Sequence, residues 1–343
     1  MNKKTVLFLP VFTLLLASCS TGGKHYDSKE YVAGTLKYKD DFRILQMTDV
    51  HLGNQDILEK HFDFMKLTIQ ESNADLIVVT GDVFTFADKN TAKETFKFFD
   101  NFNIPWTMTW GNHDEQVYFS VDWLTGTLNK YGKNCLFKDL QDDDVYGNAN
   151  FVINLTEDGT ETSKVKQQLI IMDSNRYSYA KFKGYDAIHK DQVEWYERIV
   201  KDTTSNNGNA VVPSLMFFHI PFPEFQTSYD LAKAGTNPKV KFVDDVVKSD
   251  VFNEDVCCPN ENTHLYDSIK NLKSTKGVFV GHDHVNTFCV DDDGLYLCYG
   301  IKATTRVYYE KELMGGQIVS MNSETGKISI ERKFHTYDEL EGK

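Results

Sequence analysis

The sequence predicts one α/β domain, and three observations lead to that prediction. Six short runs rich in Ile, Val, Phe and Leu have the length and composition of buried strands. Between the first two runs, residues 57–72 place apolar side chains at helical spacing. The 343 residues are 41% apolar and 25% charged, which is ordinary for a globular protein. Strands that alternate with helices in this way favour an α/β sheet.

The elements follow one another along the chain without an evident break. The six predicted strands are, in order, FRILQMTDVH, ADLIVVTGDV, PWTMTWGNHD, KQQLIIMDSN, SLMFFHIP and KGVFVGHDH. A second amphipathic helix is predicted in YDAIHKDQVEWYERI, residues 185–199. No proline-glycine linker divides residues 41–338, which favours a single domain. Residues 227–263 are expected to form a long loop or insertion.

The first residues have the pattern of an export signal. Two lysines precede an apolar run at residues 6–16 that is too short to anchor a chain across a bilayer. The letters LASC that end at Cys19 resemble the lipobox of bacterial lipoproteins, in which the cysteine is acylated. We therefore expect a lipoprotein signal peptide at residues 1–18, a tether at residues 19–38 and the folded domain at residues 39–340. The alternative is an ordinary signal peptide with a chance cysteine.

This interpretation places the domain in the cell envelope, outside the cytoplasm, attached to a membrane through a lipid on Cys19. The chain has 37 basic and 50 acidic residues and a net charge of −13. Loss of residues 1–18 removes two lysines and changes the net charge to −15. Such a surface repels polyanions, so no nucleic acid polymer is expected as a partner. A small phosphate ester remains an expected partner, because bound metal ions would attract it locally.

Two cysteines lie symmetrically about a predicted turn. If Asp293 and Gly294 form a two-residue hairpin turn, Cys289 lies directly opposite Cys298 on the neighbouring strand. Cysteines in such a pair are close enough to form a disulfide, which persists in an exported protein. The alternative is that Cys289 and Cys298 are both buried thiols. The pairing of Cys135, Cys257 and Cys258 is left open.

Polar residues of the kinds that bind metal ions follow five of the six predicted strands. They are Asp49 and His51, Asp82, Asn112 with His113 and Asp114, His219, and His282 with His284. One histidine after a strand is more often structural than functional. Five such groups in one chain indicate a metal site, because sites in open α/β sheets assemble at the carboxyl ends of strands.

In this order, DVH, GDV, GNHD, FFHIP and GHDH resemble the signature of the calcineurin-like metallophosphoesterase superfamily. The segments LIVVTGD, GNHDE, FFHIPFPEF, FVGHDHVN and LCYG are most similar to its small purple-acid-phosphatase-like branch. Thr85 stands where a true purple acid phosphatase has its tyrosine ligand, and His51 stands where that enzyme has glycine. We therefore expect no tyrosinate ligand. The resemblance implies two facing mixed β-sheets flanked by helices, the β-sandwich of the calcineurin-like phosphoesterase fold.

The resemblance also implies a site for two metal ions, each of which is Fe, Mn or Zn. One ion would be bound by Asp49, His51, Asp82 and His284, and the other by Asp82, Asn112, His219 and His282. Asp82 would bridge the two. Each residue has a structural alternative, since Asp82 or Asn112 could cap a turn and His219 could simply pack at a strand end.

By the same resemblance, His113 would protonate the leaving oxygen or stabilise the phosphorus centre, and Asp114 would orient its ring. The implied reaction is hydrolysis of a phosphate ester, with a monoester favoured, by in-line attack of a metal-bridging hydroxide. One alternative is a phosphodiesterase or nucleotide hydrolase with the same metals. Another is a binding lipoprotein without turnover. Asp283, between His282 and His284, is expected to point away from both metals, either supporting the ligands or facing solvent.

Overall fold

The computed structural model describes residues 30–54, 58–117, 119–140, 144–178 and 184–341. The expected signal peptide and Cys19 lie outside the described residues. No helix in the described part of the chain has the length and apolar character needed to cross a membrane.

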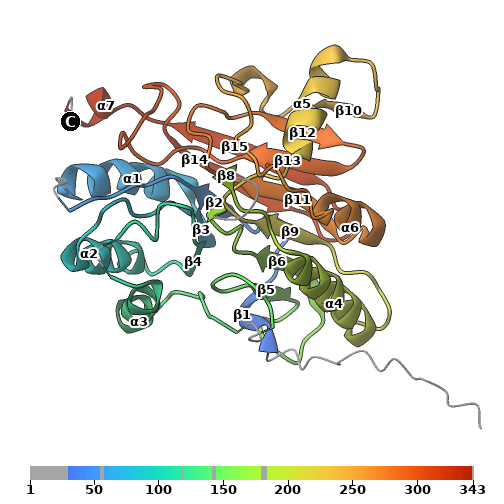
Figure 1. The fold of residues 1–343 in the computed structure, drawn as a ribbon. Coiled ribbons are helices and arrows are strands. Elements are labelled where there is room, and N and C mark those ends of the chain that lie inside the picture. The colour runs from blue at the N-terminus through green and yellow to red at the C-terminus, as the bar shows by residue number, and fades with distance from the viewer. Residues whose placement is uncertain (1–29, 55–57, 118, 141–143, 179–183, 342–343) are drawn as a thin grey trace, which may run out of the picture.

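Two mixed β-sheets pack face to face between two layers of helices (Figure 1). The smaller sheet, in the order β15-β14-β2-β3-β4, consists of β15 (Ile328–Phe334), β14 (Gly315–Met321), β2 (Ile44–Met47), β3 (Leu76–Thr80) and β4 (Trp106–Thr109). Strands β2, β3 and β4 of this sheet run parallel to one another. Its outer face is covered by α1 (Leu58–Ser72), α2 (Lys89–Asp100) and α3 (Val121–Tyr131).

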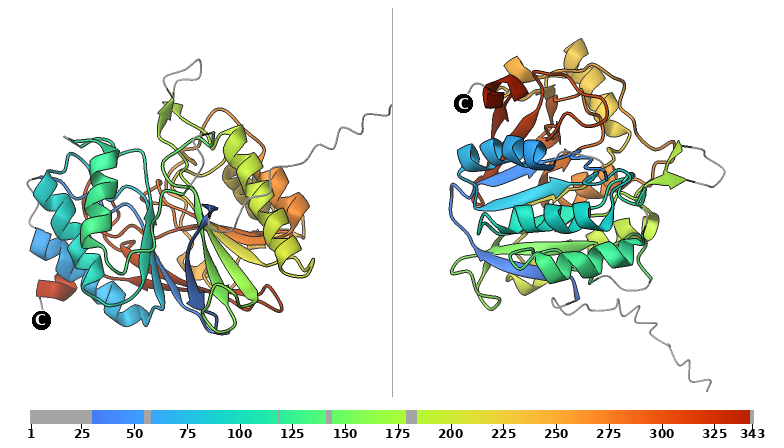
Figure 2. Two further views of the ribbon diagram at one scale, coloured as in Figure 1. Left: turned by 90° about the horizontal axis from the view of Figure 1, so that it is seen from below. Right: turned by 90° about the vertical axis from the view of Figure 1, so that its left-hand side faces the viewer.

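The larger sheet has eight strands in the order β1-β5-β6-β9-β11-β13-β12-β10. They are β1 (Val32–Lys37), β5 (Phe151–Thr156), β6 (Val165–Ile171), β9 (Ser214–Phe217), β11 (Thr275–Val280), β13 (Leu295–Tyr299), β12 (Cys289–Asp292) and β10 (Val240–Phe242). Figure 2 shows the helices α4 (Lys190–Asn206) and α6 (Leu265–Leu272) on the side of the molecule away from α1, α2 and α3. The remaining elements are α5 (Glu224–Ala234), the 3-10 helix η2 (Val247–Ser249), α7 (Tyr337–Glu341) and a small hairpin of β7 (Tyr177–Ser178) and β8 (Gly184–Tyr185).

Side chains alternate across the strands of the larger sheet and so fill two cores. Leu215 and Phe217 of β9 belong to the cluster that also contains the buried residues of β2, β3 and β4. Met216, between them, belongs to a second cluster with Trp195 and Tyr196 of α4. This is the period of two expected of a strand that is buried on both faces. The predicted α/β fold with two facing sheets is confirmed.

The predicted tether is wrong at its carboxyl end. Residues 32–37 form β1, which pairs in parallel with β5, and the preceding Tyr31 is buried. The partner strand lies more than a hundred residues further along the chain, so no local hairpin pattern marked this segment as a strand. The folded part therefore begins before residue 39.

The predicted long loop at residues 227–263 is also only partly a loop. It contains most of α5, all of β10 and the 3-10 helix η2. β10 adds to the edge of the larger sheet by pairing with β12. These elements are short, and their apolar residues are too few for a periodicity that could be read from the sequence.

The hairpin of β12 and β13 has the predicted register. Asp292 pairs with Leu295, which leaves Asp293 and Gly294 as a two-residue turn with positive φ at both positions. Cys289 lies opposite Cys298, with a Cα–Cα distance of 4.1 Å, and the two form a disulfide. Cys135, Cys257 and Cys258 are free thiols.

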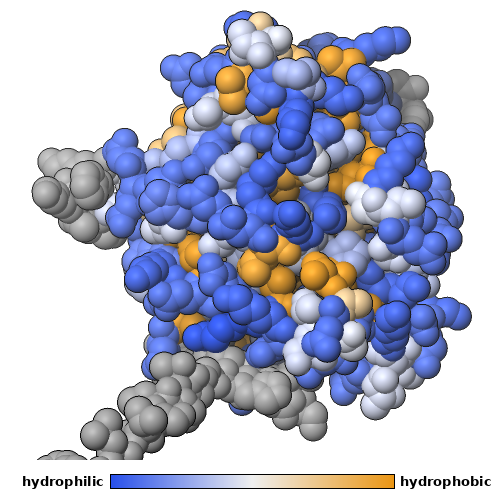
Figure 3. All heavy atoms as spheres, turned by 90° about the vertical axis from the view of Figure 1, so that its right-hand side faces the viewer, coloured by the Kyte–Doolittle hydropathy of each residue, from blue (hydrophilic) through white to orange (hydrophobic). Residues whose placement is uncertain are grey.

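The surface over the α4 and α6 side is mainly hydrophilic, and its apolar side chains occur in small groups between polar ones (Figure 3). The features that stand out chemically are inside the molecule, where the strands of both sheets end.

Candidate metal centre

The ligand-type residues meet where parallel strands of both sheets end. In the smaller sheet, β2, β3 and β4 lead into Asp49, Asp82 and Asn112. In the larger sheet, the parallel strands β9 and β11 lead into His219 and His282. Carboxyl ends of parallel strands converge on one edge, which is where sites in α/β proteins assemble. Here the edges of two facing sheets contribute to one site.

The backbone at these strand ends adopts an uncommon conformation. Asp49 and His51 have φ of 54°, Asp82 has φ of 51° and His282 has φ of 80°. Positive φ is unfavourable for residues with a Cβ and is concentrated at functional sites. The turns support one another, because the His51 amide donates to the carbonyl of Asp82 over 2.8 Å. The strain is thus held by contacts between the loops that bear the ligands.

Two glycines allow these loops to approach closely. A Cβ at Gly111 would lie 2.3 Å from Oδ1 of Asp82, and a Cβ at Gly281 would lie 2.0 Å from Oγ1 of Thr48. Neither distance is compatible with a side chain. The glycines of the GNHD and GHDH motifs are therefore required by packing against the neighbouring ligand loops.

Two clusters of metal-ligating side chains share one carboxylate. The first consists of Asp49, His51, Asp82 and His284, and the second consists of Asp82, His219 and His282. Within each cluster, one ligand atom from every residue lies within 4.8 Å of the others, and all of these residues are buried. The structure thus brings together the Asp and His residues that the sequence assigned to two ions, with Asp82 in both clusters.

Unpaired polar atoms in the second cluster and on the neighbouring Asn112 fit metal ions. Oδ1 of Asn112 and Nε2 of His282 are buried and have no hydrogen-bond partner. The other end of the Asn112 amide is fixed, because its Nδ2 donates to the hydroxyl of Tyr177 over 2.9 Å. A buried polar atom without a partner is costly unless an ion or water satisfies it. Amide oxygen and imidazole nitrogen are both ligands for transition metals.

The tautomers of two histidines point to the same conclusion. Nδ1 of His284 lies 2.8 Å from the carbonyl oxygen of Tyr308, and Nδ1 of His219 lies 2.8 Å from that of Thr80. A carbonyl only accepts, so Nδ1 carries the proton and, in the neutral ring, Nε2 presents a lone pair. Nε2 of His219 is 3.2 Å from Oδ2 of Asp82. In the neutral ring this lone pair would face the carboxylate oxygen, so either a proton or a metal ion belongs between the two atoms.

The electrostatics of the centre favour a bound cation. Burial lowers the pKa of His51 and of His282 to about 3, so both rings are neutral and able to donate a lone pair at neutral pH. Burial also opposes protonation of His219, but the Asp82 carboxylate outweighs it and raises the pKa of His219 to about 10. A positive charge beside Asp82 is thus strongly stabilised, whether a proton or a metal ion supplies it.

His113 lies beside the clusters and differs from the ligands in being partly exposed. Its amide donates to Oδ1 of Asp82 over 2.7 Å, and its ring centroid is 5.1 Å from that of His51. Nδ1 of the ring is 2.7 Å from Oε1 of Gln116. The prediction that Asp114 orients this ring is wrong.

Asp114 instead accepts from two backbone amides. Its Oδ1 is 2.8 Å from the amide of Phe84 and its Oδ2 is 2.8 Å from that of Gly111. Burial, and then repulsion from Asp82, raise the pKa of this carboxyl to about 8. Asp114 therefore fixes the loops that hold Asp82 and Asn112, while the residue that faces the imidazole is Gln116.

Asp283 is buried, so of the two predicted alternatives it supports the ligands and does not face solvent. Its carboxylate accepts from the hydroxyl of Tyr299, from Nδ2 of Asn286 over 3.1 Å and from the amide of Cys257. As predicted, it is absent from both ligand clusters. It fixes the segment between His282 and His284 from behind.

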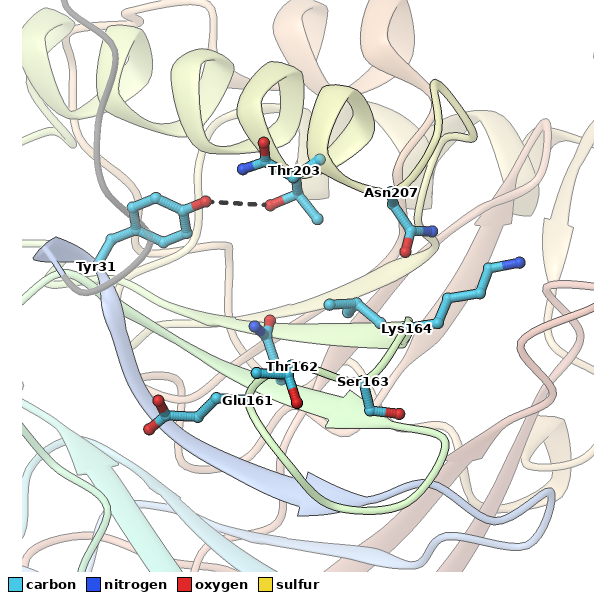
Figure 4. Close-up of a pocket in the computed structure, with 10 residues that line it drawn as sticks. Tyr31, Glu161, Thr162, Ser163, Lys164, Thr203 and Asn207 are labelled. Carbon is cyan, nitrogen blue, oxygen red and sulfur yellow. Dashed lines mark hydrogen bonds between the residues drawn. The ribbon is translucent and has the colours of Figure 1, made fainter.

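A separate polar cavity of about 390 Å³ lies between the start of β1, the β5–β6 connection and the end of α4 (Figure 4). Its lining includes Tyr31, Glu161, Lys164 and Thr203, and the hydroxyls of Tyr31 and Thr203 are 3.5 Å apart. None of the ligand-type residues is among the described residues that line it. The cavity therefore does not belong to the metal centre.

The comparison with protein families agrees with this geometry. The sequence model of the family described as calcineurin-like phosphoesterase matches residues 42–286, most of the chain. The chain belongs to the calcineurin-like phosphoesterase family. The match contains all five motifs and both clusters, so the superfamily prediction is confirmed.

Relatives within the family include purple-acid-phosphatase-like proteins. "Probable inactive purple acid phosphatase 29" of Arabidopsis thaliana is 31% identical over 76% of this chain and 71% of its own length. "Phosphatase DCR2" of Saccharomyces cerevisiae is 27% identical over 76% of this chain and 47% of its own length. A solved dimetal phosphatase from Danio rerio aligns with 87% of this chain and all of its own, at 12% identity and a TM-score of 0.49.

The two departures from the purple acid phosphatase pattern are in contact with each other. Nδ1 of His51 lies 2.7 Å from Oγ1 of Thr85. The hydroxyl of Thr85, which replaces the usual tyrosine, thus holds the ring of His51, which replaces the usual glycine. Nε2 of His51 remains directed at the first cluster. In the sequence, this contact is indicated only when His51 and Thr85 are considered together.

Three further supporting residues were not predicted. Gln116 is the partner of His113, and Oγ of Ser174 accepts from the amide of His219 over 3.2 Å. Lys302 is buried and donates from Nζ to the carbonyl of Asp49 over 2.9 Å. Burial lowers the pKa of this lysine to about 8. None of the three carries a motif, although a lysine inside the apolar run YGIKA is an unusual residue for a buried segment.

Proposed function

We propose that the protein hydrolyses phosphate esters, with a monoester as the favoured substrate. The observation that carries the proposal is the pair of buried ligand clusters that share Asp82 and contain polar atoms without partners. One ion would be held by Asp49, His51, Asp82 and His284, and the other by Asp82, Asn112, His219 and His282. When bound, two such ions supply Lewis acidity toward the phosphoryl oxygens and acidify a water molecule.

The side chains around the ions supply orientation and a proton. His113 is fixed beside Asp82 through its amide, and its Nδ1 is occupied by Gln116. Nε2 is then the atom that would hold a proton for the leaving alcohol oxygen. Because His113 is partly exposed whereas the ligands are buried, the alcohol part of the ester would lie on its side of the centre.

Two alternatives use the same fold. A diesterase or nucleotide hydrolase would need the same ligands, and the ligand set does not discriminate between ester types. A binding protein without turnover is the other alternative, and relatives named as inactive give it some weight. The complete ligand set and the oriented His113 in this chain favour an enzyme.

A substrate comparison tests the proposal. The purified protein would be assayed with an aryl phosphate and with the corresponding bis-aryl diester, each with added Fe, Mn or Zn, after elemental analysis of the bound metals. We expect faster hydrolysis of the monoester, loss of activity on chelation and recovery with metal. Faster hydrolysis of the diester would replace the favoured reaction by its alternative. Absence of turnover with every metal would leave the binding function.

We also propose that the domain is held in the cell envelope by a lipid on Cys19, outside the cytoplasm. The support is the sequence pattern of residues 1–19. The full chain would be produced in a bacterium and separated into membrane and soluble fractions, alongside a Cys19→Ser variant. We expect the parent in the membrane fraction and the variant released. Equal distribution of the two would contradict the anchor.

A further inference from the structure

The β7–β8 hairpin places two tyrosines beside the metal centre. Tyr177 pairs with Tyr185 across the hairpin, and the two rings are stacked with centroids 5.6 Å apart and planes at 29°. Figure 2 shows this hairpin projecting from the body of the molecule. Both tyrosines are partly exposed, so one part of each ring is available to a ligand.

Tyr185 contacts a residue of the second cluster, and Tyr177 contacts two residues of the neighbouring GNHD loop. Tyr185 meets the ring of His282 edge to face, with centroids 4.3 Å apart. The hydroxyl of Tyr177 accepts from Nδ2 of Asn112 over 2.9 Å. The ring of Tyr177 is also perpendicular to that of His113, at a centroid distance of 6.4 Å. The two tyrosines thus lie beside the second cluster on the side of the partly exposed His113.

The base of the hairpin is held by polar contacts, so the positions of the rings are defined. The amide of Asp186 donates to the carbonyl of Arg176 over 2.8 Å, directly below the two tyrosines. Arg176 forms an ion pair with Glu115, which is two residues after His113. Asn175 donates from Nδ2 to the carbonyl of Ala187 over 2.7 Å. The two sides of the hairpin are therefore tied to each other at the base, and the β7 end is tied to the loop that bears His113.

We propose that Tyr177 and Tyr185 bind a planar aromatic ring in the alcohol part of the substrate. The inference rests on the proposed phosphoesterase function, since it places the leaving alcohol beside His113. Favoured substrates are then phosphomonoesters of ring-bearing alcohols, of which nucleosides and arylalkyl alcohols are the two classes. Aromatic side chains bind such rings by stacking or edge-to-face contact.

Matched substrates separate ring recognition from leaving-group chemistry. A nucleoside 5′-monophosphate and ribose 5-phosphate both leave through the primary hydroxyl at C5 of a ribose, and only the first carries a base. Phenethyl phosphate and butyl phosphate form a second pair, without a nucleobase. The ratio of kcat/KM within each pair would be measured on the metal-loaded protein. We expect the ring-bearing member to be preferred by about tenfold in at least one pair, in line with the usual strength of base–aromatic stacking.

Variants of the tyrosines test which residues produce the preference. Tyr185→Leu and Tyr177→Leu should each lower the ratio toward one. Tyr177→Phe keeps the ring, loses the bond to Asn112 and should keep the ratio. Tyr309→Leu, a change at an exposed tyrosine outside the hairpin, serves as the matched control and should also keep it. Metal content would be measured for every variant, because a ratio taken at equal metal content is insensitive to a general loss of activity.

A ratio near one in both pairs for the parent protein would overturn the inference, as would an unchanged ratio in both leucine variants. Failure of the proposed function gives a different result, namely no turnover of any of the four esters. Calorimetric binding of the nucleoside monophosphate and ribose 5-phosphate to the metal-loaded protein decides the matter in that case. Tighter binding of the ring-bearing compound would support ring recognition, and equal binding would overturn it.

Discussion

The contact between His113 and Gln116 gives the most specific prediction about catalysis. Gln116 lies in a tight turn, because its amide donates to the carbonyl of His113 over 2.8 Å, and its Oε1 is 2.7 Å from Nδ1 of the ring. This bond would fix the ring so that Nε2 faces the leaving oxygen. Gln116→Ala removes the bond, and Gln116→Glu replaces a neutral acceptor by a charged one.

The size of both effects follows from the chemistry of the contact. A single neutral hydrogen bond is worth about 1 kcal/mol, so we expect Gln116→Ala to lower kcat about fivefold. This is less than the loss of about 10² to 10⁴ expected for His113→Ala, which removes the acid itself. In Gln116→Glu the carboxylate would stabilise the protonated ring. The acid form would persist to higher pH, and the alkaline limb of the kcat profile should move up by about one unit.

The assay is the pH profile of kcat with a monoester substrate at saturating metal. Elemental analysis would accompany it, because neither Gln116 nor His113 belongs to the ligand clusters and both variants should retain their metals. Gln70→Ala, at an exposed position of α1, is the matched control. A kcat for Gln116→Ala within twofold of the parent, together with an unmoved profile for Gln116→Glu, would refute the role given to this bond.

Three other predictions concern the metals and the stability of the fold. Asp82→Asn weakens both clusters at once, because Asp82 belongs to both. We expect fewer than about one bound ion per chain by elemental analysis and at least a hundredfold loss of turnover. A variant with full metal content would contradict the shared role. Replacing Cys289 and Cys298 together by alanine opens a short loop, and the chain-entropy model predicts a loss of about 3 kcal/mol in the free energy of unfolding, measurable with denaturant. Burial raises the pKa of Asp173 to about 6. As the pH falls, the native state therefore binds this proton before the unfolded state does, which stabilises the parent protein. The free energy of unfolding of the parent relative to Asp173→Asn, measured on metal-free protein, should rise as the pH falls from 7.5 to 5. A difference independent of pH would show that Asp173 does not titrate in this way.

The meeting point of the ligand-type residues could be predicted from the sequence because each of them comes shortly after a strand. A residue such as Asp82 is placed by the end of its own strand, and parallel strands bring their ends together. The apolar runs that form β9 and β11 were equally local signals. What these residues share is that their position depends on a few neighbouring residues and on the general geometry of an α/β sheet.

Positions that depend on the path of a loop could not be predicted in this way. The family resemblance implied Asp114 as the partner of His113, but the turn after GNHD brings Gln116 to the ring and directs Asp114 toward the backbone of Phe84. Strand alternation predicted correctly that Asp283 is no ligand. It could not predict its burial, which is produced by the loop containing Cys257.

One of the six predicted strands, β6, is not followed by proposed ligands, and its end shows what distinguishes a ligand from a supporting residue. KQQLIIMDSN ends in Asp173, Ser174 and Asn175, residue types as suitable for a metal as those of the other five runs. Here, however, Oγ of Ser174 accepts from the amides of His219 and Ile220, at 3.2 and 2.8 Å, so its hydrogen-bonding capacity is used within the protein. Oδ1 of Asn112 and Nε2 of His282 have no such partner. The residue type after a strand is therefore insufficient to identify a ligand. The partners of the donor atom must be considered as well, and the hydrogen bonds of Ser174 show that the end of β6 positions the His219 loop.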